Sequence, residues 1–138
     1  MVLRKYVIAF LFLFFFSATM SNEAVDRAER LTVMLTDGLS YSFDYLVDKA
    51  YSESNISRSN LAQIKDDLSA ATAVCIVDSL VRLAKEQSLD TDKLLADAED
   101  VLINQKVEAL SDVLSEEVLG QKINLCVFDA YETVGARF

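Results

Sequence analysis

The chain has 138 residues, which is the size of one domain, with 13 basic and 22 acidic residues and no histidine. The net charge of −9 argues against a nucleic-acid-binding protein, because phosphate binding needs clustered lysine and arginine. The lack of histidine excludes Ser-His-Asp and Cys-His catalytic systems and most zinc sites. We therefore expect a protein that is not an enzyme and that binds no metal and no cofactor.

The first 21 residues have the features of a secretory signal peptide. Arg4 and Lys5 form a short basic region, residues 7–16 are an unbroken apolar run, and small residues follow this run. The run is shorter than the roughly 20 apolar residues that span a bilayer, which favours cleavage over a retained membrane anchor. We expect a secreted, extracellular protein with a single helical domain over residues 22–138 and no membrane contact after cleavage.

The rest of the chain favours helices. It contains no proline and only three glycines, and no stretch alternates between apolar and polar residues with a period of two. A start signal recurs four times: a Ser or Asp cap that follows an apolar residue and precedes another apolar residue by four positions. The four caps are Ser21, Ser57, Asp90 and Ser115. This pattern predicts an all-α fold, an antiparallel four-helix bundle.

Apolar residues at a helical period define the four predicted helices. These helices cover residues 22–51, 58–87, 91–112 and 116–134. Glycine within a helix costs about 1 kcal/mol relative to alanine, so we consider the first helix both as continuous and as split near Gly38. The second helix contains the apolar stretch Ala70–Ala84, which predicts a central helix that is buried on more than one side. Its alanines favour tight packing and leave little room for a ligand.

The two cysteines, Cys75 and Cys126, predict a disulfide, because an even number of cysteines in a secreted protein is typically paired. A third helix that continued to Leu119 would place them roughly 13 Å apart along the bundle, too far for a bridge. A reversal of the chain near Val113–Ser115 would bring them level. Two free thiols and an intermolecular bridge are the alternatives.

Two polar motifs have less specific meanings. Asn55 starts an Asn-Ile-Ser sequence in an expected loop, and this sequence is a glycosylation acceptor in a protein from a eukaryotic source. Asp90 and Asp92 have a spacing that resembles a calcium loop, but the glycine and the final glutamate of an EF-hand are missing. We interpret this second motif as a helix cap with a solvated acidic face.

An aromatic group follows in the second half of the first helix. Its members are Tyr41, Phe43, Tyr45 and Tyr51. These side chains could fill the core and cover its rim, or they could line a pocket for an apolar ligand whose polar end binds the tyrosine hydroxyls. Because the central helix is tightly packed, we expect any pocket at this aromatic end.

Two classes of function remain, and both are binding functions. We favour a carrier of a small apolar ligand held between helices. The alternative is an interaction module or secreted effector that binds an extracellular protein through a helix face. A structural, self-associating protein is a weaker third option.

Overall fold

The computed structural model describes residues 20–50, 52 and 56–135. This part of the chain forms four α-helices and one 3-10 turn, and no β-strand occurs within it. The elements are α2 (Asn22–Ala50), α3 (Arg58–Glu86), α4 (Thr91–Leu102), the 3-10 turn η1 (Val107–Ala109) and α5 (Glu116–Gly135). The prediction of an all-α fold with four helices is confirmed.

Each helix begins directly after its predicted cap. The side-chain oxygen of the cap accepts a hydrogen bond from the backbone N–H three residues later, which satisfies a donor that the helix start leaves unpaired. These pairs are Ser21 with Ala24, Ser57 with Asn60, Asp90 with Lys93 and Ser115 with Val118, at 3.2–3.3 Å. The recurring start signal therefore located all four helix N-termini.

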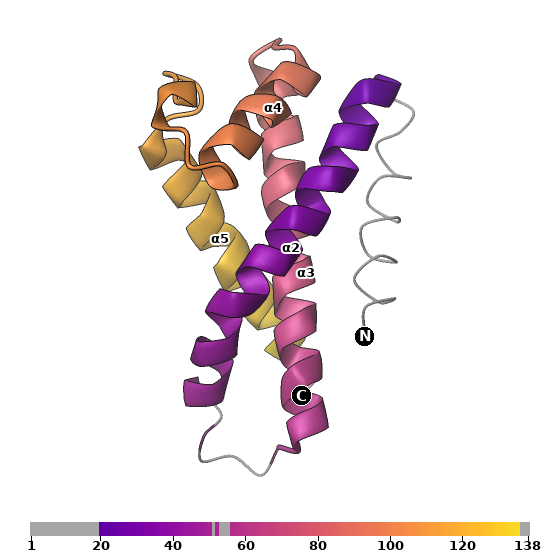
Figure 1. The fold of residues 1–138 in the computed structure, drawn as a ribbon, viewed down its shortest axis with the longest axis vertical. Helices are drawn as coiled ribbons and strands as arrows, with labels where there is room; N and C mark the ends of the chain where they lie inside the picture. Colours follow the sequence, from indigo (N-terminus) through magenta and orange to yellow (C-terminus); the bar gives the residue numbers. More distant parts are fainter. Residues whose placement is uncertain (1–19, 51, 53–55, 136–138) are drawn as a thin grey trace.

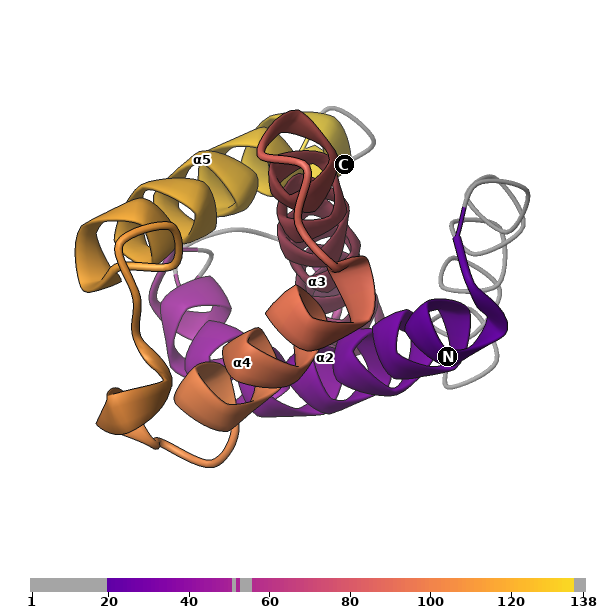
Figure 2. The ribbon, with the colours of Figure 1, turned by 90° about the horizontal axis from the view of Figure 1, so that it is seen from above.

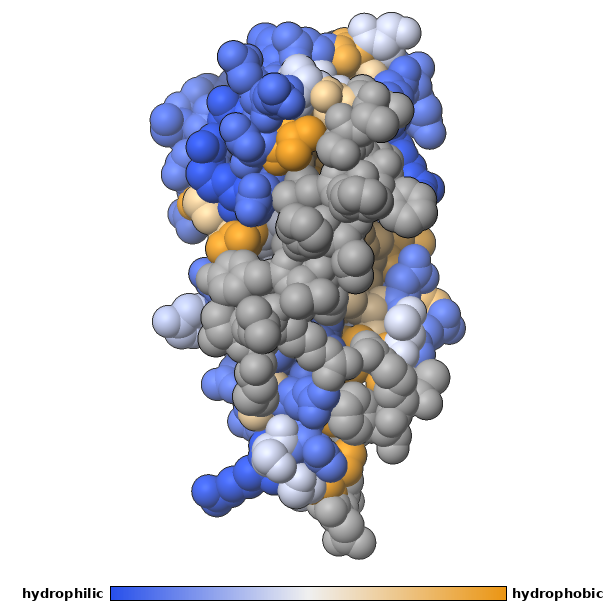
Figure 3. Space-filling model, turned by 90° about the vertical axis from the view of Figure 1, so that its right-hand side faces the viewer, coloured by the Kyte–Doolittle hydropathy of each residue, from blue (hydrophilic) through white to orange (hydrophobic). Residues whose placement is uncertain are grey.

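Helix α3 is the central helix of the bundle. It packs against α2, α4 and α5, as the two perpendicular views show (Figure 1 and Figure 2). Most of its apolar stretch is buried, and Ala73, Val77, Leu80 and Val81 have no or almost no exposed surface. This burial on several sides explains why the stretch is apolar nearly all round. Figure 3 shows that hydrophilic side chains cover much of the upper part of one outer face.

The core consists of two clusters at different heights of α3. Leu119 from the start of α5 belongs to the cluster that contains Leu80 near the end of α3. Val134 from the end of α5 belongs to the cluster that contains Ile64 near the start of α3. Helix α5 therefore runs antiparallel to α3, as α2 and α4 do (Figure 1).

Helix α4 is ten residues shorter than predicted. It ends at Leu102, and the chain returns toward the top of the bundle through residues 103–115 before α5 descends (Figure 1). The cause lies in Gln105, which has a left-handed φ of 56°, and in Lys106, whose backbone N–H donates to the carbonyl of Asp100 at 2.8 Å. The predicted helix over residues 91–112 was therefore wrong in its second half.

Helix α2 is continuous through Gly38. The first helix is thus not split, although glycine is unfavourable in a helix by about 1 kcal/mol. Residues on both sides of Gly38 are buried, among them Leu35 and Phe43. Tertiary packing on both sides outweighs this local cost.

The predicted cysteine pair is present. Cys75 of α3 and Cys126 of α5 form a disulfide with a Cα–Cα distance of 5.5 Å, and no free cysteine remains among the described residues. The two cysteines are level, as expected. The chain reaches this arrangement by returning through residues 103–115 rather than by the simple reversal near Val113–Ser115 that the sequence suggested.

Candidate functional site

Among the described residues, the predicted aromatic side chains differ in exposure. Phe43 is 2% exposed and meets the ring of Tyr131 edge-on, with 5.9 Å between ring centroids. Tyr41 and Tyr45 are 85% and 67% exposed. Tyr51 lies outside the described residues. Phe43 therefore fills the core, and the hypothesis of a pocket at these four residues stays a prediction.

The predicted glycosylation acceptor also cannot be placed. Asn55 lies outside the described residues, but Ser57 of the same motif is exposed at the start of α3. Occupancy of Asn55 by a sugar stays a prediction.

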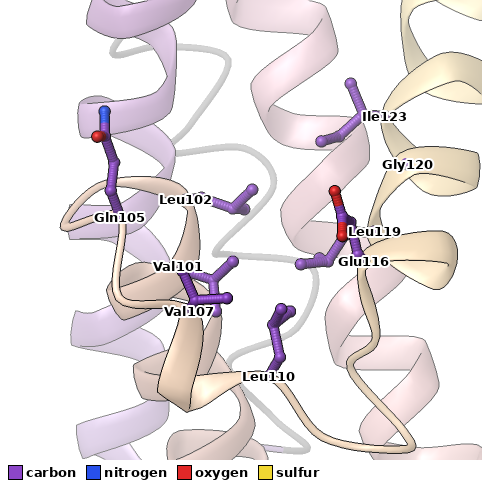
Figure 4. A pocket seen from close by; sticks show the side chains of 9 residues that line it. All are labelled: Val101, Leu102, Gln105, Val107, Leu110, Glu116, Leu119, Gly120 and Ile123. Carbon is purple, nitrogen blue, oxygen red and sulfur yellow. The ribbon is translucent and has the colours of Figure 1, made fainter.

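An apolar pocket lies at the opposite end of the bundle, between the end of α4, η1 and the start of α5 (Figure 4). It has a volume of about 380 Å³ and is open to solvent on one side. The pocket is lined by Val101, Leu102, Gln105, Val107, Leu110, Glu116, Leu119, Gly120 and Ile123. Seven of these nine residues have no polar side-chain atom.

One face of α5 forms the first wall of this pocket. Glu116, Leu119, Gly120 and Ile123 follow the i, i+3, i+4, i+7 pattern that places side chains on one face of a helix. Leu114 is fully buried just before α5, and Ser115 caps the helix, so the angle at which α5 begins is fixed. This face of α5 is thereby turned toward α4.

The second wall comes from the end of α4 and the returning chain. Val101 and Leu102 belong to the last turn of α4, and Val107 and Leu110 belong to the segment that follows (Figure 4). Asp100 holds this segment, because its carboxylate accepts a hydrogen bond from the Asn104 side chain at 3.0 Å. The backbone carbonyl of Asp100 also accepts the hydrogen bond from the backbone N–H of Lys106.

Ion pairs anchor α4 on α2 and so hold this second wall in place. Arg27 Nε donates to Asp92 at 2.7 Å, and Arg27 Nη1 donates to Glu99 at 3.3 Å. Arg30 also donates to Glu99 at 3.3 Å. The hydrogen bond with Asp92 raises the pKa of Arg27 despite an opposing effect of burial, so this side chain stays charged wherever the protein is folded.

Glycine leaves space in the first wall. A Cβ at Gly120 would have no neighbouring atom within 4 Å beyond its own helical backbone. Because Gly120 shares the face of Leu119 and Ile123, a larger side chain at this position would extend into the pocket. Gly38 on α2 is equally unobstructed but lies outside the pocket.

The lining offers few polar groups for chemistry. Gln105 and Glu116 are its only polar side chains, and they lie on opposite sides of the pocket (Figure 4). No group of three or more potential metal ligands occurs in the residues that the structure describes. The arrangement is suited to holding an apolar molecule with one polar end.

No family model, no curated protein and no solved structure matches this chain. Within the described ranges, none of the helices has both the length and the apolarity required to cross a membrane.

Proposed function

We propose that this protein binds a small apolar molecule in the pocket between α4, η1 and α5. The supporting observation is the pocket itself, which has about 380 Å³ and a lining with only two polar side chains. Known ligand pockets of proteins range from about 300 to 1,000 Å³ and are mostly apolar, with a few polar groups that orient the ligand. The pocket is at the lower end of that range, which favours a small ligand.

We further propose that the protein works outside the cell as a non-enzymatic carrier. The predicted signal peptide over residues 1–21 directs the chain to a secretory route. The Cys75–Cys126 disulfide supports this location, because disulfides persist in oxidising compartments. The lining contains a single carboxylate and no second ionisable side chain that could work with it as an acid–base pair, which favours binding over catalysis.

Filling the pocket tests the proposal. We expect Gly120→Leu to weaken the binding of the neutral fluorescent probe N-phenyl-1-naphthylamine by about tenfold or more, because the new side chain takes the ligand's space. The substitution should not destabilise α5, since leucine is better than glycine in a helix by about 0.8 kcal/mol. Fluorescence titration of the purified protein measures the affinity.

The matched control is Gly38→Leu, which makes the same exchange on α2 outside the pocket. It should bind the probe as the wild type does. If the wild type binds no probe, or if both variants bind it equally well, the pocket is not the binding site.

A protein partner is the second candidate, and exposed apolar residues of α5 favour it. Leu125 and Phe128 are 65% and 61% exposed and lie one turn apart on the outer face of α5. Such side chains are typical of contact surfaces when they occur together. Self-association at micromolar concentration in sedimentation velocity, together with a lack of probe binding, would favour this candidate over the carrier.

A further inference from the structure

The polar groups of the pocket point to one chemical class of ligand. Glu116 is the only charged residue in the lining, and Figure 4 shows its carboxylate beside Leu119 on the α5 wall. We infer that the pocket selects apolar molecules with a positively charged amine end and disfavours those with a carboxylate end. This inference rests on the proposed function, because it names the ligand class for the same pocket.

The Glu116 carboxylate is available to a ligand. Among the described residues, no lysine or arginine forms an ion pair with it, whereas Asp92, Glu99 and Asp100 are all engaged by cations. The Gln105 side chain on the opposite side likewise has no hydrogen-bond partner in the described part of the chain, so its carbonyl oxygen can accept from an ammonium group. Because the two side chains lie on opposite sides of the pocket, we assign the cationic end of the ligand to Glu116.

The charge around the pocket has the same sign as Glu116. Residues 99–123, which contain both walls, include six acidic and only two basic residues. One of the two basic residues, Lys106, already lies 3.8 Å from the Asp100 carboxylate. The other, Lys122, is not part of the lining. A carboxylate ligand would meet net repulsion, and an amine would meet net attraction.

The start of α5 opposes this preference for an amine, but its effect is weaker than that of the nearby carboxylates. A helix N-terminus carries roughly half a positive charge, which would attract an anion. The carboxylates of Glu116 and Glu117 stand in this first turn with a full negative charge each, and Ser115 already satisfies the backbone N–H of Val118. The sum at the pocket is therefore negative.

Three probes with the same tail and different ends test the inference. Decylamine, decanol and decanoate would each be used at neutral pH to displace N-phenyl-1-naphthylamine from the full-length protein. At low ionic strength we expect decylamine to bind about tenfold more tightly than decanoate, with decanol between them. The difference should shrink in about 1 M salt, where the screening length falls to about 3 Å.

A pair of neighbouring variants separates the pocket from the general acidity of the protein. Glu116→Gln should weaken the binding of decylamine about two- to fivefold, which is the range expected for a partly exposed ion pair. It should leave the affinity for decanol unchanged. Glu117→Gln removes the same charge from the same helical turn but outside the lining, so it should weaken decylamine binding less than Glu116→Gln does and should leave decanol binding unchanged.

The outcomes distinguish this inference from the function on which it rests. If all three probes bind equally well, or if both variants weaken decylamine alike, the charge selection is wrong and the apolar pocket still stands. If none of the three displaces the fluorescent probe, the proposed function fails as well.

Discussion

Thr72 is a polar residue in the buried apolar stretch of α3. It is fully buried, and its hydroxyl has no hydrogen-bond partner among the described residues. Thr32 of α2 is also buried, but its hydroxyl donates to the carbonyl of Ala28 at 2.7 Å. A buried hydroxyl without a partner costs about 1–3 kcal/mol of stability. Thr72 therefore lowers the stability of the fold, whereas Thr32, which is equally buried, does not.

Replacement of Thr72 by valine should stabilise the protein. Valine has nearly the same shape and removes the unpaired hydroxyl, so we expect Thr72→Val to raise the free energy of unfolding by about 1 kcal/mol. Thr32→Val makes the same exchange at a position where the hydroxyl is paired, so it should not raise the free energy of unfolding. Urea denaturation of both variants measures the difference. An equal effect of the two substitutions would contradict this account.

At the scale of the elements, the helix starts were predictable from sequence and one helix end was not. A cap needs a short polar side chain at one position, and Ser21, Ser57, Asp90 and Ser115 satisfy this need by type alone. The ends of α3 and α4 use left-handed residues, Ser88 with φ 54° and Gln105 with φ 56°. Such positions are usually glycine or asparagine, so the sequence carries no signal that α4 ends early.

This hidden helix end also explains why the pocket could not be predicted. Leu119 and Ile123 fit the apolar periodicity of the last predicted helix, but such a stripe alone does not show which residues face it. Val107 and Leu110 reach the opposite wall only because the chain turns back after Leu102. That turn depends on local hydrogen bonds around Asp100, which apolar periodicity does not detect.

Lys65 links α3 to α2 and makes their packing sensitive to pH. Its ammonium lies 2.6 Å from the Asp44 carboxylate and 2.9 Å from that of Asp48. The hydrogen bonds with Asp44 and then Asp48 raise the pKa of Lys65 above its ordinary value of 10.5. A raised pKa in the folded state stabilises the protein below the unfolded pKa, and this contribution is lost as pH rises through the folded pKa.

Lys65→Met should therefore lower stability at neutral pH but not at high pH. We expect a loss of about 0.5–1 kcal/mol in the free energy of unfolding, since both carboxylates are exposed. The gap between variant and wild type should close above pH ~11, past the ordinary lysine pKa. As a control, Lys93→Met removes a single 3.7 Å contact with Asp97 and should change stability by only about 0.3 kcal/mol. A gap that widens with pH would overturn the assignment.

At the scale of the whole molecule, we expect the disulfide to contribute much of the stability. It closes a loop over a sequence separation of 51 residues. Loop-closure entropy gives about 4 kcal/mol for this length, and α5 packs mainly on α3, to which the bridge ties it. We expect Cys75→Ala/Cys126→Ala to lower the free energy of unfolding by about this amount in urea denaturation. Reduction of the wild type should reproduce the loss, and an unchanged unfolding curve after reduction would refute the prediction.

The position of the bridge has a consequence for the segment between α4 and α5. Residues 104–108 and 111–112 are exposed, so a protease can reach this segment. A single cut there would leave one fragment with Cys75 and the other with Cys126. The two fragments would stay covalently joined, with α3 and α5 still packed together. The nicked protein would migrate as one species until a reductant separates it into two.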